Sequence, residues 1–357
     1  MNPTQTTSLV ELTRGKIVES IHFGAFAVVD PSGRLVASSG DPGLVTFLRS
    51  SAKPFQALPF VEQNGDEAFH LTQRELAILC ASHSGTDEHV EVVRGIQEKV
   101  GVREADLLCG TQPPYHQPTI KAMLLRGEDP TPIRHECSGK HTGMLAHAKM
   151  RGLPTQEYID PEHPVQKSIL ASFAEMCGVP EESVELGIDG CSAPNFAVPL
   201  RSAALAFARL MDPEGLAPNR AAACRRISAA MTAHPDMVAG PQRFDTDLMT
   251  LAGGRILTKG GAEGFQGVGL YPGALGPGSP ALGIAIKVSD GDPAGRAKSF
   301  VALELLHQLG AISEADLERF AGRVGGPIYN WRRLRVGEMR ASFTLGRDVW
   351  SGRAAQD

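Results

Sequence analysis

The chain has 357 residues, 42% hydrophobic and 21% charged, a composition typical of a globular protein with a sizeable core. Its net charge of -5 and its scattered basic residues give no electrostatic footprint for nucleic acid or an anionic membrane surface. With no export-like N-terminus and no long apolar run, we expect a cytoplasmic protein that acts on a small molecule. Six widely spaced cysteines predict free thiols rather than a disulfide framework.

The first predicted element is a β-hairpin over Val18–Val36, whose strands are joined by a turn at residues 30–33. A helix follows, in which Thr72 and Glu75 form a capping box ahead of an apolar run. The segment Ser82–Gly85 breaks that helix. The serines of this segment are therefore expected at a helix end.

Helical periodicity dominates the middle of the chain. Apolar residues spaced by three and four predict helices over Glu88–Val100, Gly143–Met150, Pro164–Met176, Leu200–Leu210, Ala221–Met231 and Lys298–Leu309. Later runs bounded by glycine and proline predict strands over Arg255–Lys259, Phe265–Tyr271 and Leu282–Ser289, with a loop at 272–280. Strands early and late with helices between them imply an α+β fold, with a sheet from about 10–60 and 250–340 and a helical middle part at about 65–250.

The segment at residues 49–54 places Ser50 three residues before Lys53. On a helix these two residues share a face, and Pro54 restricts them to its first turn. A serine hydroxyl needs a base to become a good nucleophile, and a lysine amine is a base only when burial or a second cation keeps it neutral. The pair is a weak signal by itself, because a solvent-facing helix start has the same pattern.

Two further segments strengthen this hypothesis. Ser82-His83-Ser84 lies at the helix-to-loop junction, and Lys259-Gly260-Gly261 ends a late strand. Together with Ser50 and Lys53 they follow the order of the three elements of penicillin-recognising serine enzymes. Ser84 and Gly260 stand where those enzymes have asparagine and threonine, which argues against β-lactam chemistry.

Two other segments, residues 135–143 and 187–195, are dense in groups that bind metals or donate hydrogen bonds. Cys137, Lys140 and Cys191 could ligate Zn²⁺ once deprotonated, although their spacing matches no standard zinc motif. Loop residues packed beside a pocket would give the same pattern.

Asp189, at a predicted strand end, could hold a lysine or the α-amino group of a substrate, or it is an ordinary turn residue. His141 follows Lys140 of this candidate zinc set and could serve the site. A structural histidine held by hydrogen bonds would give the same pattern.

Five segments in this order resemble the L-asparaginase II family, the rhizobial-type L-asparaginases, over about Val10–Val336. They are Arg49–Pro54, Ala81–Gly85, Cys137–Gly143, Gly187–Pro194 and Lys259–Gly264. The resemblance implies a serine β-lactamase/glutaminase-like α+β fold, with an antiparallel sheet flanked by helices and a largely helical insertion. It also implies a single asparaginase chain over residues 1–357 that forms a homodimer.

The resemblance also assigns residues to roles. It implies two Ser–Lys pairs, Ser50 with Lys53 and Ser82 with Lys259. It implies a Zn²⁺ site, here Cys137, Lys140 and Cys191, that supports substrate binding rather than generating the nucleophile. The residues expected to bind substrate are Arg49, His141 and Asp189.

These observations predict an L-asparagine amidohydrolase. Neutral Lys53 takes the proton of Ser50, which attacks the side-chain amide and forms an acyl-enzyme as ammonia leaves. Ser82 and Lys259 relay the proton and keep Lys53 neutral by charge repulsion. The alternatives are a penicillin-binding or β-lactamase-like serine hydrolase and a non-catalytic zinc- or ligand-binding protein of the same fold. The preference between asparagine and glutamine stays open, because one methylene separates them.

Overall fold

The computed structural model describes residues 3–346, which form two compact units. The sheet unit comprises residues 3–48, 198–212 and 260–346; the helical unit comprises residues 49–197 and 213–259. Both ends of the predicted 1–357 chain, residues 1–2 and 347–357, lie outside the described residues. Within residues 3–346, no helix combines the length and apolar character needed to cross a bilayer.

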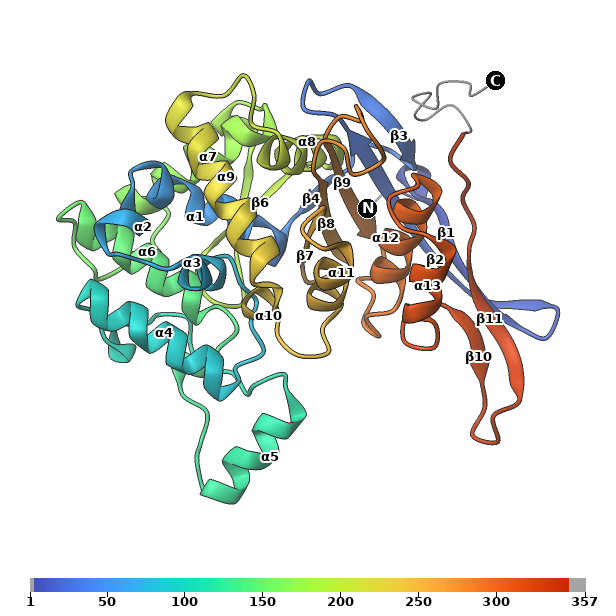
Figure 1. Cartoon of the computed structure of the whole chain (residues 1–357), viewed down its shortest axis with the longest axis horizontal. Coiled ribbons are helices and arrows are strands. Elements are labelled where there is room, and N and C mark those ends of the chain that lie inside the picture. The colour runs from blue at the N-terminus through green and yellow to red at the C-terminus, as the bar shows by residue number, and fades with distance from the viewer. Residues whose placement is uncertain (1–2, 347–357) are drawn as a thin grey trace. The chain divides into compact units, whose positions relative to one another are not determined.

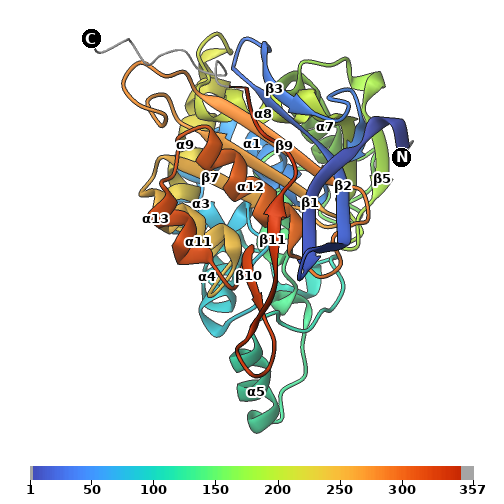
Figure 2. The ribbon, with the colours of Figure 1, turned by 90° about the vertical axis from the view of Figure 1, so that its right-hand side faces the viewer.

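Six strands of the sheet unit pair antiparallel in the order β10-β11-β1-β2-β9-β8, and β3 also pairs with β2 (Figures 1 and 2). The central strand β2 aligns Phe26 with Ile286 on one side and with Ser39 on the other. All residues of β8 and β9 are buried, as expected for strands covered on both faces. The strands are β1 (Thr7–Arg14), β2 (Ile17–Val29), β3 (Leu35–Ser39), β4 (Val45–Phe47), β8 (Phe265–Leu270), β9 (Leu282–Val288), β10 (Gly326–Tyr329) and β11 (Arg335–Ala341).

Helix α8 (Leu200–Met211) packs on β8 and β9 at one glycine of each strand. A Cβ atom at Gly283 would lie 1.9 Å from the Ala204 carbonyl oxygen, and one at Gly267 would lie 2.2 Å from the Phe207 ring. Only glycine therefore permits this close approach of helix and sheet. The unit also contains a 3₁₀ turn, η1 (Pro3–Gln5), and the helices α12 (Ala297–Gln308) and α13 (Glu314–Phe320).

The helical unit is built around α1, α3, α6, α7 and α9, with aromatic packing in its interior. The Phe173 ring lies 6.1 Å from that of Phe55 and 4.7 Å from that of Phe196, centroid to centroid. The helices are α1 (Lys53–Glu62), α2 (Gly65–Ala68), α3 (Gln73–Leu79), α4 (Asp87–Val100), α5 (Gln117–Arg126), α6 (Ser138–Met150), α7 (Pro164–Cys177), α9 (Pro218–Ala233), α10 (Pro235–Val238) and α11 (Phe244–Ala252). The 3₁₀ turns are η2 (Arg49–Ala52), η3 (Glu104–Asp106), η4 (Pro132–Arg134) and η5 (Glu181–Ser183), and the strands are β5 (Glu185–Ile188), β6 (Pro194–Pro199) and β7 (Ile256–Gly260).

The predicted α+β fold, with an antiparallel sheet flanked by helices and a largely helical insertion in the sequence, is confirmed. The hairpin over Val18–Val36 is present as β2 and β3, and the capping box of Thr72 and Glu75 starts α3. Helix α6 begins at Ser138, five residues before the predicted Gly143, because its first turn is polar and lacks the apolar periodicity on which the prediction rested.

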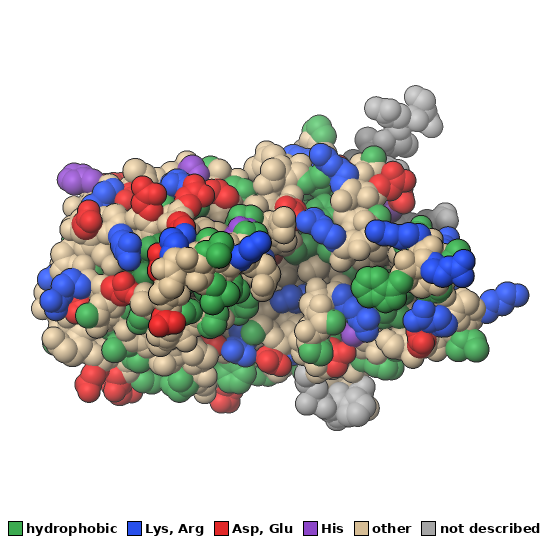
Figure 3. Space-filling view, turned by 90° about the horizontal axis from the view of Figure 1, so that it is seen from below, with side chains coloured by type: hydrophobic (Ala, Val, Ile, Leu, Met, Phe, Trp, Pro, Cys, Tyr) green, Lys and Arg blue, Asp and Glu red, His purple; other side chains and the backbone are tan. Residues whose placement is uncertain are grey.

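The surface agrees with the scattered charge of the sequence. On the face drawn in Figure 3, acidic and basic side chains are interspersed with apolar ones.

Candidate functional site

The hydroxyl of Ser82 accepts hydrogen bonds from two lysine amines. Lys53 Nζ lies 2.7 Å and Lys259 Nζ 2.9 Å from Ser82 Oγ. Ser82 follows the end of α3, Lys53 begins α1 and Lys259 lies on β7. Both lysine side chains are fully buried. Three segments that are distant in the sequence thus converge on one hydroxyl group.

The electrostatics of this group favour a neutral amine. Burial, followed by the positive charge of Lys53, lowers the pKa of Lys259 from 10.5 to about 7. A hydroxyl has one hydrogen and two lone pairs, so Ser82 can donate to a neutral Lys259 while it accepts from Lys53. The arrangement is therefore a proton path between two amines through one hydroxyl.

Ser50 lies in η2 and is partly exposed. Within the described residues, no hydrogen bond joins Ser50 to Lys53, because the Lys53 side chain runs into the interior and reaches Ser82 instead. The structure thus brings together Ser82 with Lys259, as expected, and adds Lys53 to them. The neighbouring Ser51, which sequence reasoning passed over, is buried and donates a hydrogen bond to the Lys259 carbonyl oxygen. Its only signal in the sequence is its place between Ser50 and Lys53.

The segment that carries Ser82 is held along its backbone. The Ser82 N–H donates to the Val238 carbonyl oxygen at 2.9 Å, and Ser84 Oγ donates to the Ala239 carbonyl oxygen at 2.7 Å. These bonds fix the position of the hydroxyl relative to the end of α10.

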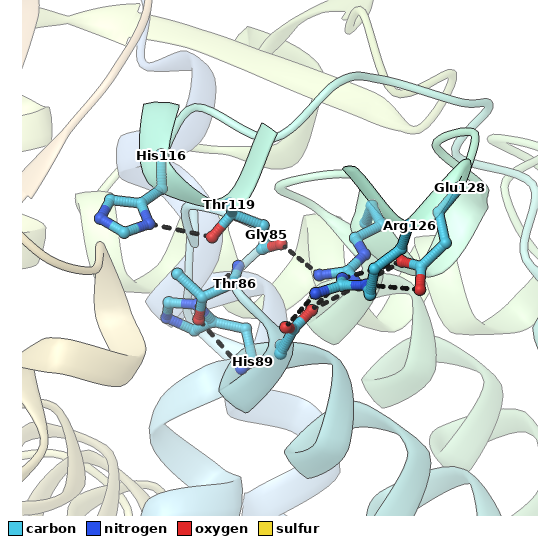
Figure 4. Close-up of polar contacts among 9 residues, drawn as sticks. Gly85, Thr86, His89, His116, Thr119, Arg126 and Glu128 are labelled. Carbon is cyan, nitrogen blue, oxygen red and sulfur yellow. Dashed lines mark hydrogen bonds and ion pairs between the residues drawn. The ribbon is translucent and has the colours of Figure 1, made fainter. Parts of the chain in front are cut away.

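A charged network follows this segment (Figure 4). Arg134 Nη1 donates to the Gly85 carbonyl oxygen at 3.0 Å and Arg134 Nη2 pairs with Asp87 at 2.6 Å, while Arg126 pairs with Glu128. The side chains of Asp87, Arg126, Glu128 and Arg134 line a groove of about 920 Å³ beside α4. Its lining includes neither Ser82 nor the two lysines, and Arg126 and Arg134 are already paired, so the network supports the segment rather than forming the reactive site.

A second buried cluster joins α6 to the turn after β5. Cys137 caps α6, Lys140 lies in its first turn, and Lys140 Nζ is 2.9 Å from Cys191 Sγ. A hydrogen bond from the Cys191 thiol, together with the charges of Lys53 and Lys140, lowers the pKa of Cys137 to about 6 despite burial. Burial opposes charge on Lys140, but the two sulfurs outweigh it and raise the pKa of the amine. The sulfur pair thus holds one negative charge beside an ammonium.

The chemistry of this cluster fits a zinc ion. Thiolates are zinc ligands, the lowered pKa of Cys137, about 6, favours its thiolate at neutral pH, and Lys140 Nζ lies beside the Cys191 sulfur. Among residues 3–346, no three His, Cys, Asp or Glu side chains form a metal-ligand group, so the third ligand would have to be the deprotonated amine of Lys140. The predicted set of Cys137, Lys140 and Cys191 is therefore brought together.

Arg49 and Asp189 form an ion pair in which the guanidinium Nη2 and Nε lie 2.7 and 2.9 Å from Asp189 Oδ1. Burial alone would raise the pKa of Asp189, but Lys140 and Arg49 together hold it below its usual value. Arg49 has a left-handed backbone (φ 51°), and its N–H donates to Asn195 Oδ1 at 3.1 Å. The amide of Asn195, which sequence reasoning did not assign, thus fixes this conformation.

His141, the third predicted substrate-binding residue, is fully buried in α6. Burial lowers its pKa to about 4, so the imidazole is neutral at neutral pH. Its Nδ1 contacts the Tyr158 hydroxyl, and its electrostatic partner on the other side is Cys191.

The sequence matches the family model of L-asparaginase II over residues 10–341. No curated protein sequence matches it. Among solved structures, it is similar to Mglu in its native form, with 16% identity and a TM-score of 0.41 over 79% of this chain and 63% of that chain. It is also similar to a probable glutaminase from Bacillus subtilis complexed with 6-diazo-5-oxo-L-norleucine, with 12% identity and a TM-score of 0.37 over 79% and 82% of the two chains. The chain thus spans less than two thirds of the length of Mglu. Because the family model covers residues 10–341 of 357, the chain belongs to the L-asparaginase II family.

Proposed function

We propose that the chain hydrolyses the side-chain amide of L-asparagine through an acyl-enzyme on a serine that a neutral lysine activates. The observation that carries the proposal is the pair of hydrogen bonds from Lys53 and Lys259 to Ser82 Oγ. The pKa of Lys259, lowered to about 7 by burial and by Lys53, supports it, because a neutral amine is then present at neutral pH. Membership of the L-asparaginase II family supports an amide as the bond that is cleaved.

The steps follow the proton path. Ser82 passes a proton from Lys53 to neutral Lys259, which leaves the Lys53 amine neutral. After a side-chain rotation toward Ser50, this amine accepts the hydroxyl proton as Ser50 Oγ forms a bond to the amide carbon. The Lys53 ammonium then protonates the amide nitrogen, the C–N bond breaks, and ammonia leaves an ester on Ser50. Water, deprotonated by Lys53, hydrolyses the ester to aspartate and restores the serine.

Ser82 is the alternative nucleophile. Its hydroxyl is almost fully buried, and its oxygen lies within hydrogen-bonding distance of both lysine amines, an arrangement that suits a relay. Ser50 is partly exposed and has no hydrogen bond from its hydroxyl within the described part of the chain, so a substrate can reach it. These differences favour Ser50 for the attack.

Substrate binding is assigned to the Arg49–Asp189 pair and to the cluster of Cys137, Lys140 and Cys191, whose lysine acts on Asp189 through its charge. The α-ammonium and α-carboxylate groups of asparagine match the charges of Asp189 and Arg49, which now neutralise each other. When bound by Cys137, Lys140 and Cys191, a zinc ion would supply a fixed positive charge that helps to position the substrate. The homodimer expected from the resemblance stays a prediction, which sedimentation analysis tests.

The test is ammonia release from asparagine and glutamine, measured side by side for the wild-type protein and variants. Ser50→Ala and Lys53→Ala should each lower kcat for asparagine by at least about a hundredfold, whereas Ser8→Ala, a serine substitution on β1 of the sheet unit, should leave it unchanged. Mass spectrometry of the trapped acyl-enzyme should locate the ester on Ser50. Full activity of Ser50→Ala, or an ester on Ser82, overturns the assignment of the nucleophile. Turnover of a chromogenic cephalosporin without ammonia from asparagine would favour a β-lactamase-like hydrolase.

A further inference from the structure

The hydroxyl of Tyr158 contacts two nitrogen atoms in the interior of the helical unit. The Leu108 N–H donates to Tyr158 Oη at 2.9 Å, and His141 Nδ1 lies 2.6 Å from the same oxygen. The Tyr158 and His141 rings meet edge to face, with centroids 5.6 Å apart and planes at 79°. Gln166 Nε2 donates to the Tyr158 carbonyl oxygen at 2.8 Å, and Tyr158 is fully buried. The phenol is thus fixed in place.

These contacts decide which nitrogen of His141 carries the hydrogen. A backbone N–H can only donate, so Leu108 uses a lone pair of Tyr158 Oη and leaves the phenol hydrogen for the other neighbour. That neighbour is His141 Nδ1, which must accept. The reverse arrangement, with the hydrogen on Nδ1, would leave a buried phenol hydrogen without an acceptor, a costly state. Burial also raises the pKa of Tyr158, so the phenol keeps its hydrogen.

We propose that Tyr158 is a positioning residue that fixes His141 in the tautomer with hydrogen on Nε2, making this imidazole an N–H donor within the site. A nitrogen that carries hydrogen has no lone pair for a metal, so Nε2 of His141 is a donor and not a zinc ligand.

The other side of the ring points to a ligand. His141 is fully buried, and its Nε2 faces the Cys191 sulfur, a weak hydrogen-bond acceptor, with no nitrogen or oxygen partner in the described part of the chain. A sulfur atom satisfies a buried N–H only weakly, so this donor gains a stronger hydrogen bond when an oxygen acceptor binds. An oxygen atom of the bound amino acid would accept this hydrogen bond from His141 Nε2. This consequence for binding rests on the proposed function, whereas the tautomer does not.

The tautomer is tested by nitrogen NMR on protein labelled with ¹⁵N-histidine. The signals that disappear in His141→Gln identify this residue, and in the wild-type protein they should show hydrogen on Nε2 and none on Nδ1. Tyr158→Phe should change these signals. Tyr329→Phe, which removes the hydroxyl of an exposed tyrosine, should not. A wild-type spectrum with hydrogen on Nδ1 overturns the proposal.

Kinetics test the consequence for binding. Tyr158→Phe should raise KM for asparagine about tenfold and change kcat by less than about threefold, because the hydrogen bond orients the substrate and does not take part in the chemistry. His141→Gln retains an N–H donor without needing the phenol, so adding Tyr158→Phe to it should cause no further rise in KM. Additive effects, or equal KM values for Tyr158→Phe and Tyr329→Phe, overturn the positioning role. If the wild-type protein releases no ammonia from asparagine, the proposed function fails, and the NMR result still decides the tautomer.

Discussion

The amines of Lys53 and Lys259 share a single hydrogen-bond acceptor, the hydroxyl oxygen of Ser82. Both amines are buried, and the charge of Lys53 disfavours a second charge on Lys259. Above about pH 7, the amine of Lys259 is therefore mostly neutral and can accept a proton through Ser82. This relationship determines the first three predictions.

The activity should rise with pH through a value of about 7. The lowered pKa of Lys259 means that the neutral amine needed for proton transfer forms as pH increases through this value and is fully formed above it. We expect kcat/KM for asparagine, from initial rates of ammonia release, to increase up to about pH 8 and then to level off. A profile that is flat or falls through neutral pH would contradict the role of Lys259 as the proton acceptor.

The stability of the fold should respond to pH in the same direction. The folded-state pKa of Lys259 is about 7, whereas an unfolded lysine keeps its proton up to about pH 10.4, so the unfolded chain binds more protons between these values. The penalty of burying the charged amine is present below pH 7 and is relieved as pH rises through this window. We expect the free energy of unfolding of the wild-type protein, relative to Lys259→Met, to increase between about pH 7 and about pH 10, as measured by urea denaturation. A difference that does not change with pH would argue against a neutral Lys259.

Replacement of Ser82 by alanine should impair both stability and catalysis. The variant leaves two buried amines without their shared acceptor, which should cost about 1–3 kcal/mol of folding free energy. Because the proton path is also lost, ammonia release should fall by at least about a hundredfold. Ser84→Ala is the matched control, since it removes a neighbouring buried hydrogen bond to the Ala239 carbonyl without affecting the amines. Equal activity losses in the two variants would mean that Ser82 acts only through folding.

Arg49→Lys should weaken substrate binding more than it slows the reaction. Lysine keeps the charge but lacks the planar group that contacts Asp189 through two nitrogen atoms. We expect KM for asparagine to rise about tenfold, with kcat changed by less than about threefold. Arg335→Lys, in an exposed ion pair with Glu338, is the control. A loss confined to kcat would assign Arg49 to the chemical step instead.

Cys137→Ser should abolish stoichiometric zinc binding. Thiolates are strong zinc ligands, and the lowered pKa of Cys137, about 6, makes its thiolate available at neutral pH. Metal analysis after dialysis against zinc should find one ion per wild-type chain and none in this variant. Cys224→Ser, which alters a buried cysteine of α9, should retain the ion. Removal of zinc with a chelator should raise KM for asparagine and still allow the acyl-enzyme to form. If the Cys224→Ser variant also loses zinc, the ion binds elsewhere.

The sequence predicts which helix or strand carries each residue of the Ser–Lys site, because local residue patterns determine those elements. The capping box at Thr72 places Ser82 just beyond a helix, and a β-branched run places Lys259 on a strand, both as expected. The direction of a long flexible side chain is not encoded locally. Lys53 reaches Ser82 rather than Ser50, because tertiary packing selects among its rotamers.

The residues that sequence reasoning missed act through contacts of the folded state. Tyr158 lies in a segment without periodicity, and its partners Leu108 and His141 come from two other parts of the chain. Ser51 likewise owes its role to the Lys259 carbonyl, far along the chain. Neither contact has a signature in local residue spacing.

The 177 residues that separate Ser82 from Lys259 have a kinetic consequence. A contact of such high sequence separation forms only when a long loop closes, which carries an entropic cost. During synthesis, a ribosome-bound chain from which Lys259 has not yet emerged contains the Ser82 hydroxyl but lacks the Lys259 amine that contacts it. Amide cleavage should therefore begin only after this long-range contact has formed, so recovery of activity reports completed folding rather than early helix formation.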